Sequence, residues 1–280
     1  MDPYFAQSTL EDATEACRSA GGLARQGHHG SSLLLFTRVV SDCEVLLSRV
    51  APDDTVFAAA DELYAHALGA AIAAASEVCA SVVATSKPCE AVRVYSIVLE
   101  VACKAQHSAV LLPSEVYEDA ARLHAQARQK ALGALPAVSA EAERLAGSTS
   151  RSREAISLFA LVCDVSERVR AGLLACDTLH SEAERLHAHA LERSVAIAHK
   201  AVAALAWQEA KLGGACSLAA FPGLQRQPSG APLPHAETLV EVLGICKRAL
   251  VTNVGTDDVR ESARQLYRPA LDGYKSALRG

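Results

Sequence analysis

The stretch AERLHAHAL (Ala183–Leu191) decides the fold of this 280-residue chain, because its pattern occurs three more times. Alanine, leucine, a ring-bearing residue and alanine occupy positions i, i+3, i+4 and i+7, the spacing of one face of an α-helix. The same pattern reads ADELYAHAL at Ala60–Leu68, AARLHAQA at Ala120–Ala127 and ARQLYRPAL at Ala263–Leu271. Because the repetition lies within one chain, it predicts four diverged copies of one helical unit.

A second helix of similar pattern precedes each copy. EAVRVY at Glu90–Tyr95, for example, matches EAISLF at Glu154–Phe159. Between the two helices lie residues typical of helix starts, such as Asp54, Ser114 and Asp177. Each unit is therefore predicted to be an antiparallel hairpin, with helices near 31–50 and 54–84, 88–108 and 114–146, 151–173 and 177–212, and 236–252 and 256–278.

The predicted fold is all-α, with four tandem antiparallel helical hairpins that form a bundle or a short solenoid. An N-terminal helix from about Pro3 to Arg25 is expected to cap the array. Pro136 is expected to end or kink the second helix of copy two. The predicted segments are a capping helix and loop (1–30), repeat 1 (31–86), repeat 2 (87–149), repeat 3 (150–213), a Pro/Gly-rich loop (214–235) and repeat 4 (236–280).

The composition excludes several function classes. Aromatic residues make up only 4% of the chain, so the core must consist of Ala, Leu and Val. A net charge of −5 argues against nucleic acid as the main partner. The apolar stretch Leu63–Ser76 is shorter than the roughly 20 residues of a membrane span, so no membrane insertion is expected. Nine cysteines without a CxxC pair predict free thiols in a reducing compartment, and no targeting peptide is recognised, which together favour the cytoplasm.

One constellation is compatible with metal chemistry. Cys176, His180, Glu184 and His187 lie on one helical stripe, and such side chains can bind zinc. The repeat register favours packing instead, because other copies carry aromatic residues at the same positions: Phe57 and Tyr117 for His180, and Tyr64 and Tyr267 for His187. We therefore predict no catalytic residue, no metal ligand and no cofactor. An all-α metal-binding protein or enzyme that uses the Cys176/His180/His187 stripe is the alternative.

Three residues are candidates for partner binding. Trp207 is the only tryptophan, and it either packs in the core or anchors a partner, as tryptophan often does at interfaces. Phe221 and Leu224 lie in the Pro/Gly-rich segment, which is either an idle linker or a contact surface.

The pattern Ala-x-x-Leu-Tyr-x-x-Ala-Leu-x-x-Tyr, complete in Ala263–Tyr274, resembles the second helix of the microtubule-interacting-and-trafficking (MIT) domain. KRAL at Lys247–Leu250 is similar to the end of that family's first helix. The resemblance implies helical units that bind short helical or extended motifs of other proteins, with a link to membrane trafficking or to microtubules. Tetratricopeptide repeats share a similar second-helix pattern, but their period of about 34 residues does not fit. The predicted function is a non-enzymatic adaptor or structural subunit that binds proteins in the cytoplasm or at the cytoskeleton.

Overall fold

The computed structural model describes residues 3–81, 87–148, 151–174, 176–211, 234–252 and 256–279, and these contain helices and connections but no strand. The predicted all-α fold is confirmed. The observed helix ends lie within three residues of the predicted ones. The helices of the described residues are α1 (Pro3–Arg25), α2 (His29–Arg49), α3 (Thr55–Ser81), α4 (Pro88–Gln106), α5 (Ser114–Ala146), α6 (Ser152–Arg170), α7 (Thr178–Lys211), α8 (Pro234–Val251) and α9 (Asp257–Arg279).

The chain divides into two compact units, Met1–Gly133 and Ala134–Gly280, and the boundary falls inside α5. Pro136 lies just past this boundary, and α5 continues through it to Ala146, so the proline does not end the helix. Proline removes one backbone hydrogen bond from a helix interior. The buried side chains of Leu132, Leu135 and Val138 pack on both sides of this interruption. The predicted segment boundaries do not coincide with this division and stay a prediction.

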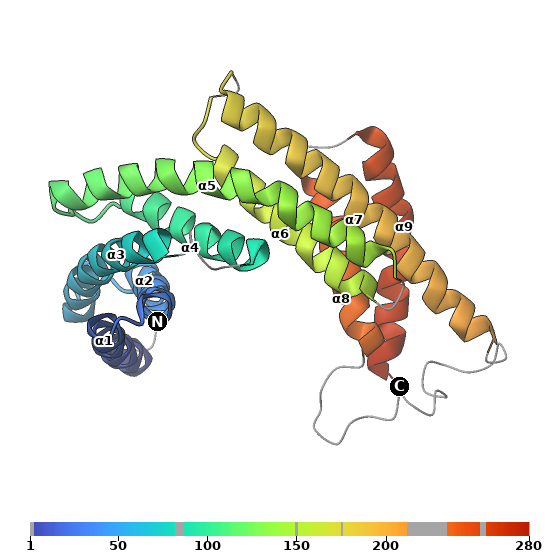
Figure 1. Cartoon of the computed structure of the whole chain (residues 1–280). Helices are drawn as coiled ribbons and strands as arrows, with labels where there is room; N and C mark the ends of the chain where they lie inside the picture. Colours follow the sequence, from blue (N-terminus) through green and yellow to red (C-terminus); the bar gives the residue numbers. More distant parts are fainter. Residues whose placement is uncertain are drawn as a thin grey trace. The chain divides into compact units, whose positions relative to one another are not determined.

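In the first unit, α1, α2 and α3 pack against one another, and α4 packs against α3 (Figure 1). The Ser32 hydroxyl donates to the carbonyl of Ala20 at 2.9 Å and ties α2 to α1. Lys130 Nζ donates to the carbonyl of Cys79 at 3.1 Å and ties the first half of α5 to α3. One apolar cluster joins the ends of three helices and consists of Ala6, Leu10, Leu46, Val56 and Ala60, with Leu47, Val50 and Leu63 packed against it.

In the second unit, α6 and α7 form one hairpin and α8 and α9 form another (Figure 1). The α8 helix also contacts α6 and α7, and α9 contacts α7. Phe159 of α6 is the largest fully buried side chain among the described residues. Arg193 of α7 donates to Glu143 of α5 through two bonds, the shorter at 2.5 Å. His199 of α7 lies 3.1 Å from the carbonyl of Ser262 in α9.

The four pattern segments bury corresponding side chains. The alanines at the first and last pattern positions are all inaccessible to solvent: Ala60, Ala67, Ala120, Ala127, Ala183, Ala190, Ala263 and Ala270. Three of the anchor leucines are buried, namely Leu123, Leu186 and Leu266, while Leu63 is half-buried. In every segment, therefore, the alanines lie on the buried face of the helix.

Among the described residues, α3 is the one helix long and apolar enough to cross a membrane by length and composition. Half of its most apolar window is already buried in the structure. A buried core helix has the same properties, so α3 alone carries no argument for a membrane span. The expected absence of membrane insertion stays a prediction.

Candidate functional site

The structure places the residues of the Cys176–His187 stripe in different surroundings. Within the described ranges, no group of three or more His, Cys, Asp or Glu side chains is arranged to hold a metal ion. Cys176 is exposed in the turn before α7, whereas His187 is fully buried. Glu184 is exposed and forms an ion pair with Arg170 at 3.7 Å. The stripe is thus divided between solvent and core, and its residues share no ligand geometry.

His187 packs as a neutral ring between α6 and α7. Its exposed fraction is 0%, and neither ring nitrogen has a hydrogen-bond partner in the described structure. Burial first, and then the charges of Arg170 and Arg248, lower the pKa of His187 to about 4. The Ser166 hydroxyl in α6 is also buried without a partner. The environment of His187 agrees with the packing interpretation, because a neutral imidazole without partners acts as a flat apolar ring.

His124 holds the same pattern position in the first unit. It is 6% exposed, and its pKa is lowered to about 4 by burial and then by Arg128 and His107. The other two copies carry tyrosine here: Tyr64 is buried, and Tyr267 is half exposed at the surface of α9. The ring is therefore buried in three of the four copies of the pattern, and in two of these copies it belongs to a histidine.

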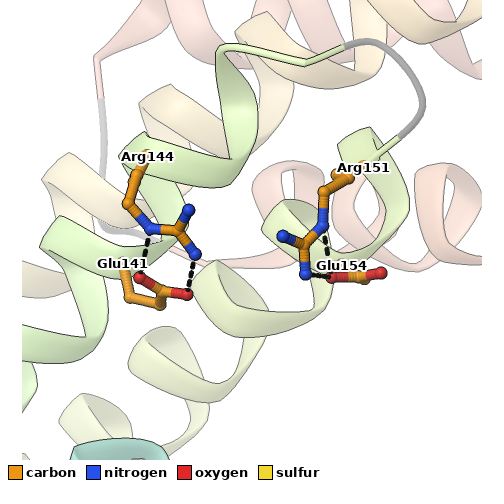
Figure 2. Close-up of polar contacts among 4 residues, drawn as sticks. All are labelled: Glu141, Arg144, Arg151 and Glu154. Atoms are coloured by element: carbon orange, nitrogen blue, oxygen red, sulfur yellow. Dashed lines mark hydrogen bonds and ion pairs between the residues drawn. The ribbon is translucent and has the colours of Figure 1, made fainter.

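Charged side chains at the junction of α5 and α6 form two local pairs (Figure 2). Arg144 donates to both carboxylate oxygens of Glu141 at 2.6 and 2.7 Å, and Arg151 donates to Glu154 at 2.6 and 3.0 Å. The hydrogen bond from Arg144, and more weakly the charge of Arg151, lower the pKa of Glu141. Since each carboxylate faces a guanidinium in solvent, these residues form a solvated surface cluster.

A polar network fixes the end of α4 in the first unit. Lys104 Nζ donates to Glu44 Oε2 at 2.7 Å and to Ser41 Oγ at 3.4 Å, which links α4 to α2. Tyr64 of α3 is beside Glu44 and Ser108. Burial and then the Glu44 charge raise the pKa of Tyr64, while the hydrogen bond with Ser108 acts in the opposite direction. The network therefore connects α2, α3 and α4 to the start of the α4–α5 connection.

Leu111 projects from this fixed connection. The carbonyl of Val110 accepts hydrogen bonds from the hydroxyls of Ser108 and Tyr117, each at 3.2 Å, and Ser108 Oγ accepts from the Val110 N–H at 3.1 Å. Leu112 is buried. Leu111 between them is 94% exposed. An ordered backbone thus holds a large apolar side chain in solvent, and an anchor held in this way loses little conformational entropy on binding.

Leu174 has the same arrangement in the α6–α7 connection of the second unit, where it is 74% exposed. The N–H of Leu173 donates to the carbonyl of Arg170 at 3.0 Å, and the carbonyl of Leu174 accepts from the N–H of Asp177 at 2.9 Å. The Asp177 carboxylate caps the first turn of α7. Gly172 turns the chain with a φ of +75°, which glycine adopts without strain.

The two exposed leucines occupy one register position. Each lies 12 residues before an anchor leucine, Leu111 before Leu123 and Leu174 before Leu186. We call Leu111 and Leu174 the connection leucines and take them as the candidate functional site. Sequence reasoning missed them because it used the connections only for helix-start signals. An apolar residue at a fixed distance from the anchor, where a turn is normally polar, is the signal that could have found them.

The predicted partner-binding residues remain untested. Trp207 lies in α7, but its side chain is outside the described part of the structure. Phe221 and Leu224 are outside the described residues altogether.

Compared with known proteins, the chain matches no family model. It also matches no curated protein.

Proposed function

We propose that this chain is a non-enzymatic helical adaptor or structural subunit that binds partner proteins, with the connection leucines as its anchors. The observation that carries the proposal is the pair itself: Leu111 and Leu174 share one register position, lie one in each unit, and are held in solvent by hydrogen-bonded backbone. Burial of one exposed leucine contributes about 2 kcal/mol.

The position of the perturbed ionisable groups supports a non-enzymatic role. Catalytic acids, bases and nucleophiles need access to a substrate. Among the described residues, the groups whose pKa departs most from the ordinary value are buried, with burial as the first cause: Cys43, His124, Cys163, His187 and Cys246. A thiol with its pKa raised to about 12, such as that of Cys163, is a poor nucleophile.

The proposal includes the origin of the fold in four diverged hairpins. Its support is the shared burial of the pattern alanines and of three of the four anchor leucines. The resemblance of Ala263–Tyr274 to the second MIT helix suggests the class of partner, namely short helical or extended protein motifs. The cytoplasmic location and the link to the cytoskeleton or to trafficking rest on the same resemblance and on the free thiols.

The test compares capture of partners by the tagged full chain and its variants from the cells that produce it, with quantitative mass spectrometry. The double variant Leu111→Ser with Leu174→Ser should capture a defined set of proteins at least about 30-fold less than the wild type, the equivalent of one leucine contact or more. Leu34→Ser is the matched control, because Leu34 is 56% exposed on the surface of α2 and belongs to neither connection. Unchanged capture by the double variant, with circular dichroism equal to wild type, would contradict the proposal.

A further inference from the structure

We propose that His124 in the first unit and His187 in the second unit each form an acid-sensitive device. In mildly acidic solution each ring loosens the packing of the helices around it. This loosening affects the stability of the fold and does not depend on partner binding. Both titratable rings lie inside helix interfaces, where each faces positive charge.

The surroundings of His187 cannot accommodate an added proton. The ring is fully buried, and neither nitrogen has an acceptor within reach. The charged groups that act on it are Arg170 from α6 and Arg248 from α8. The acids beside these two arginines are engaged, since Glu184 pairs with Arg170 and Asp164 pairs with Arg248. A protonated His187 would add a third positive charge to this interface.

Helices α6 and α8 also carry two buried thiols. The Cys163 thiol of α6 lies 3.9 Å from the His187 carbonyl, and Cys246 is buried in α8. Burial raises the pKa of both thiols, so they stay neutral in acid and offer no negative charge. Helix α6 and helix α8 therefore both oppose protonation of the ring.

His124 is also a buried ring beside positive charge in the first unit. Arg128 follows one turn later on α5, and His107 approaches from the end of α4. His107 is exposed. Protonation of His124 would therefore place a positive charge next to Arg128 and His107, which both lower its pKa.

The sign of the effect follows from linkage. Both rings have a folded-state pKa of about 4 against 6.5 for a free histidine, so the proton binds the opened chain first. The contribution of each neutral ring to the stability of the fold is complete above pH 6.5, and it is lost as the pH falls from 6.5 to 4. Between pH 7.5 and pH 5, each ring raises the open population about 25-fold.

The chain supplies its own comparison. Tyr64 and Tyr267 occupy the corresponding pattern positions of α3 and α9. A tyrosine hydroxyl keeps its proton throughout this range, because its ordinary pKa is near 10. The device is therefore confined to the copies with histidine.

The test measures the accessibility of buried thiols in the full chain at pH 7.5 and pH 5. A pyridyl disulfide that reacts in acid is the probe, peptide mass spectrometry gives the site, and exposed Cys176 normalises the intrinsic reactivity. Buried Cys163 reports on the second unit and buried Cys79 on the first. Acid should raise normalised labelling of both in the wild type. His187→Leu should remove most of the rise at Cys163 and leave Cys79 unchanged, and His124→Leu should do the reverse.

Two results would overturn the proposal. One is normalised labelling of Cys163 that rises equally in the wild type and in His187→Leu. The other needs no variant and so remains decisive if a leucine variant does not fold: an imidazole titration of the wild type by NMR that places the pKa of both histidines above 6. Titration of both rings near pH 4 supports the proposal.

Discussion

Tyr64 and His187 occupy the same place in the repeated pattern, one in each unit, and both rings are buried. The hydroxyl of Tyr64 is engaged, because it lies beside Glu44 and Ser108 and helps to fix the α4–α5 connection. The polar edge of His187 has no partner on either nitrogen. The pattern thus specifies that a flat ring packs at this place. Whether its polar atoms find partners depends on the side chains that other helices supply.

The largest expected effect is that of Tyr64→Ala. The substitution leaves a cavity between α2, α3 and α4 and removes the group that Glu44 and Ser108 contact, so it should lower the free energy of unfolding by about 3–5 kcal/mol. Tyr267→Ala is the matched control at the same pattern position, where the ring is 37% exposed, and should cost about 1 kcal/mol or less. Urea unfolding of the full chain measures both. Equal losses would mean that the two positions are packed alike.

The second effect is the pH dependence of His187. Its lowered pKa means that wild-type stability falls as the pH drops below 6.5, whereas His187→Leu lacks this term. The stability difference between the two proteins should therefore change by about 2 kcal/mol between pH 7.5 and pH 5, in favour of the leucine variant. Tyr64→Leu should show no such change, because its raised pKa keeps the hydroxyl protonated. Chemical unfolding at both pH values gives the comparison.

A smaller effect is expected from Tyr64→Phe, which keeps the ring and removes only the hydroxyl. The loss should be about 1 kcal/mol, the typical net contribution of a hydrogen-bonded hydroxyl. Amide exchange at Val110, which the same network holds through Ser108, should become faster. Unchanged exchange at Val110 would show that the connection does not depend on Tyr64.

The smallest effect is expected when His180 and His187 are both changed to Phe. His180 shares its pattern position with Phe57 and Tyr117, and His187 shares its position with Tyr64, which predicts that both are packing rings. The free energy of unfolding at pH 7.5 should then change by less than about 1 kcal/mol. Partner binding should also persist. A loss of bound zinc together with a large fall in Tm would reverse this interpretation. Metal analysis and thermal unfolding of both proteins provide the answer.

The helices could be predicted because their signals are local. The period of the apolar residues set the buried faces, and acidic caps set the starts: Asp54 accepts from the N–H of Val56 at 2.9 Å, and Asp177 accepts from that of Leu179 at 2.8 Å. Such contacts join residues two apart in the sequence and need no knowledge of the fold.

The remaining features depend on contacts between distant residues. Lys104 meets Glu44 across 60 positions, and no spacing rule predicts that pairing. The division of the chain inside α5 likewise follows from which helices pack together, while a proline alone indicated only a local interruption. The exposure of Leu111 required the positions of its neighbours, because an isolated leucine in a sequence is normally assigned to the core.

The inaccessible alanines of the repeated pattern also constrain how this sequence can change over generations. At Ala60, Ala120, Ala183 and Ala263 there is almost no accessible surface. A single added methyl group must therefore displace a neighbouring helix, and such a substitution should be selected against. Neutral substitutions should therefore accumulate at exposed positions, while the ring residue of each hairpin can change between tyrosine and histidine. Among related chains, the pattern alanines would then be conserved longest, and the ring residues would vary more.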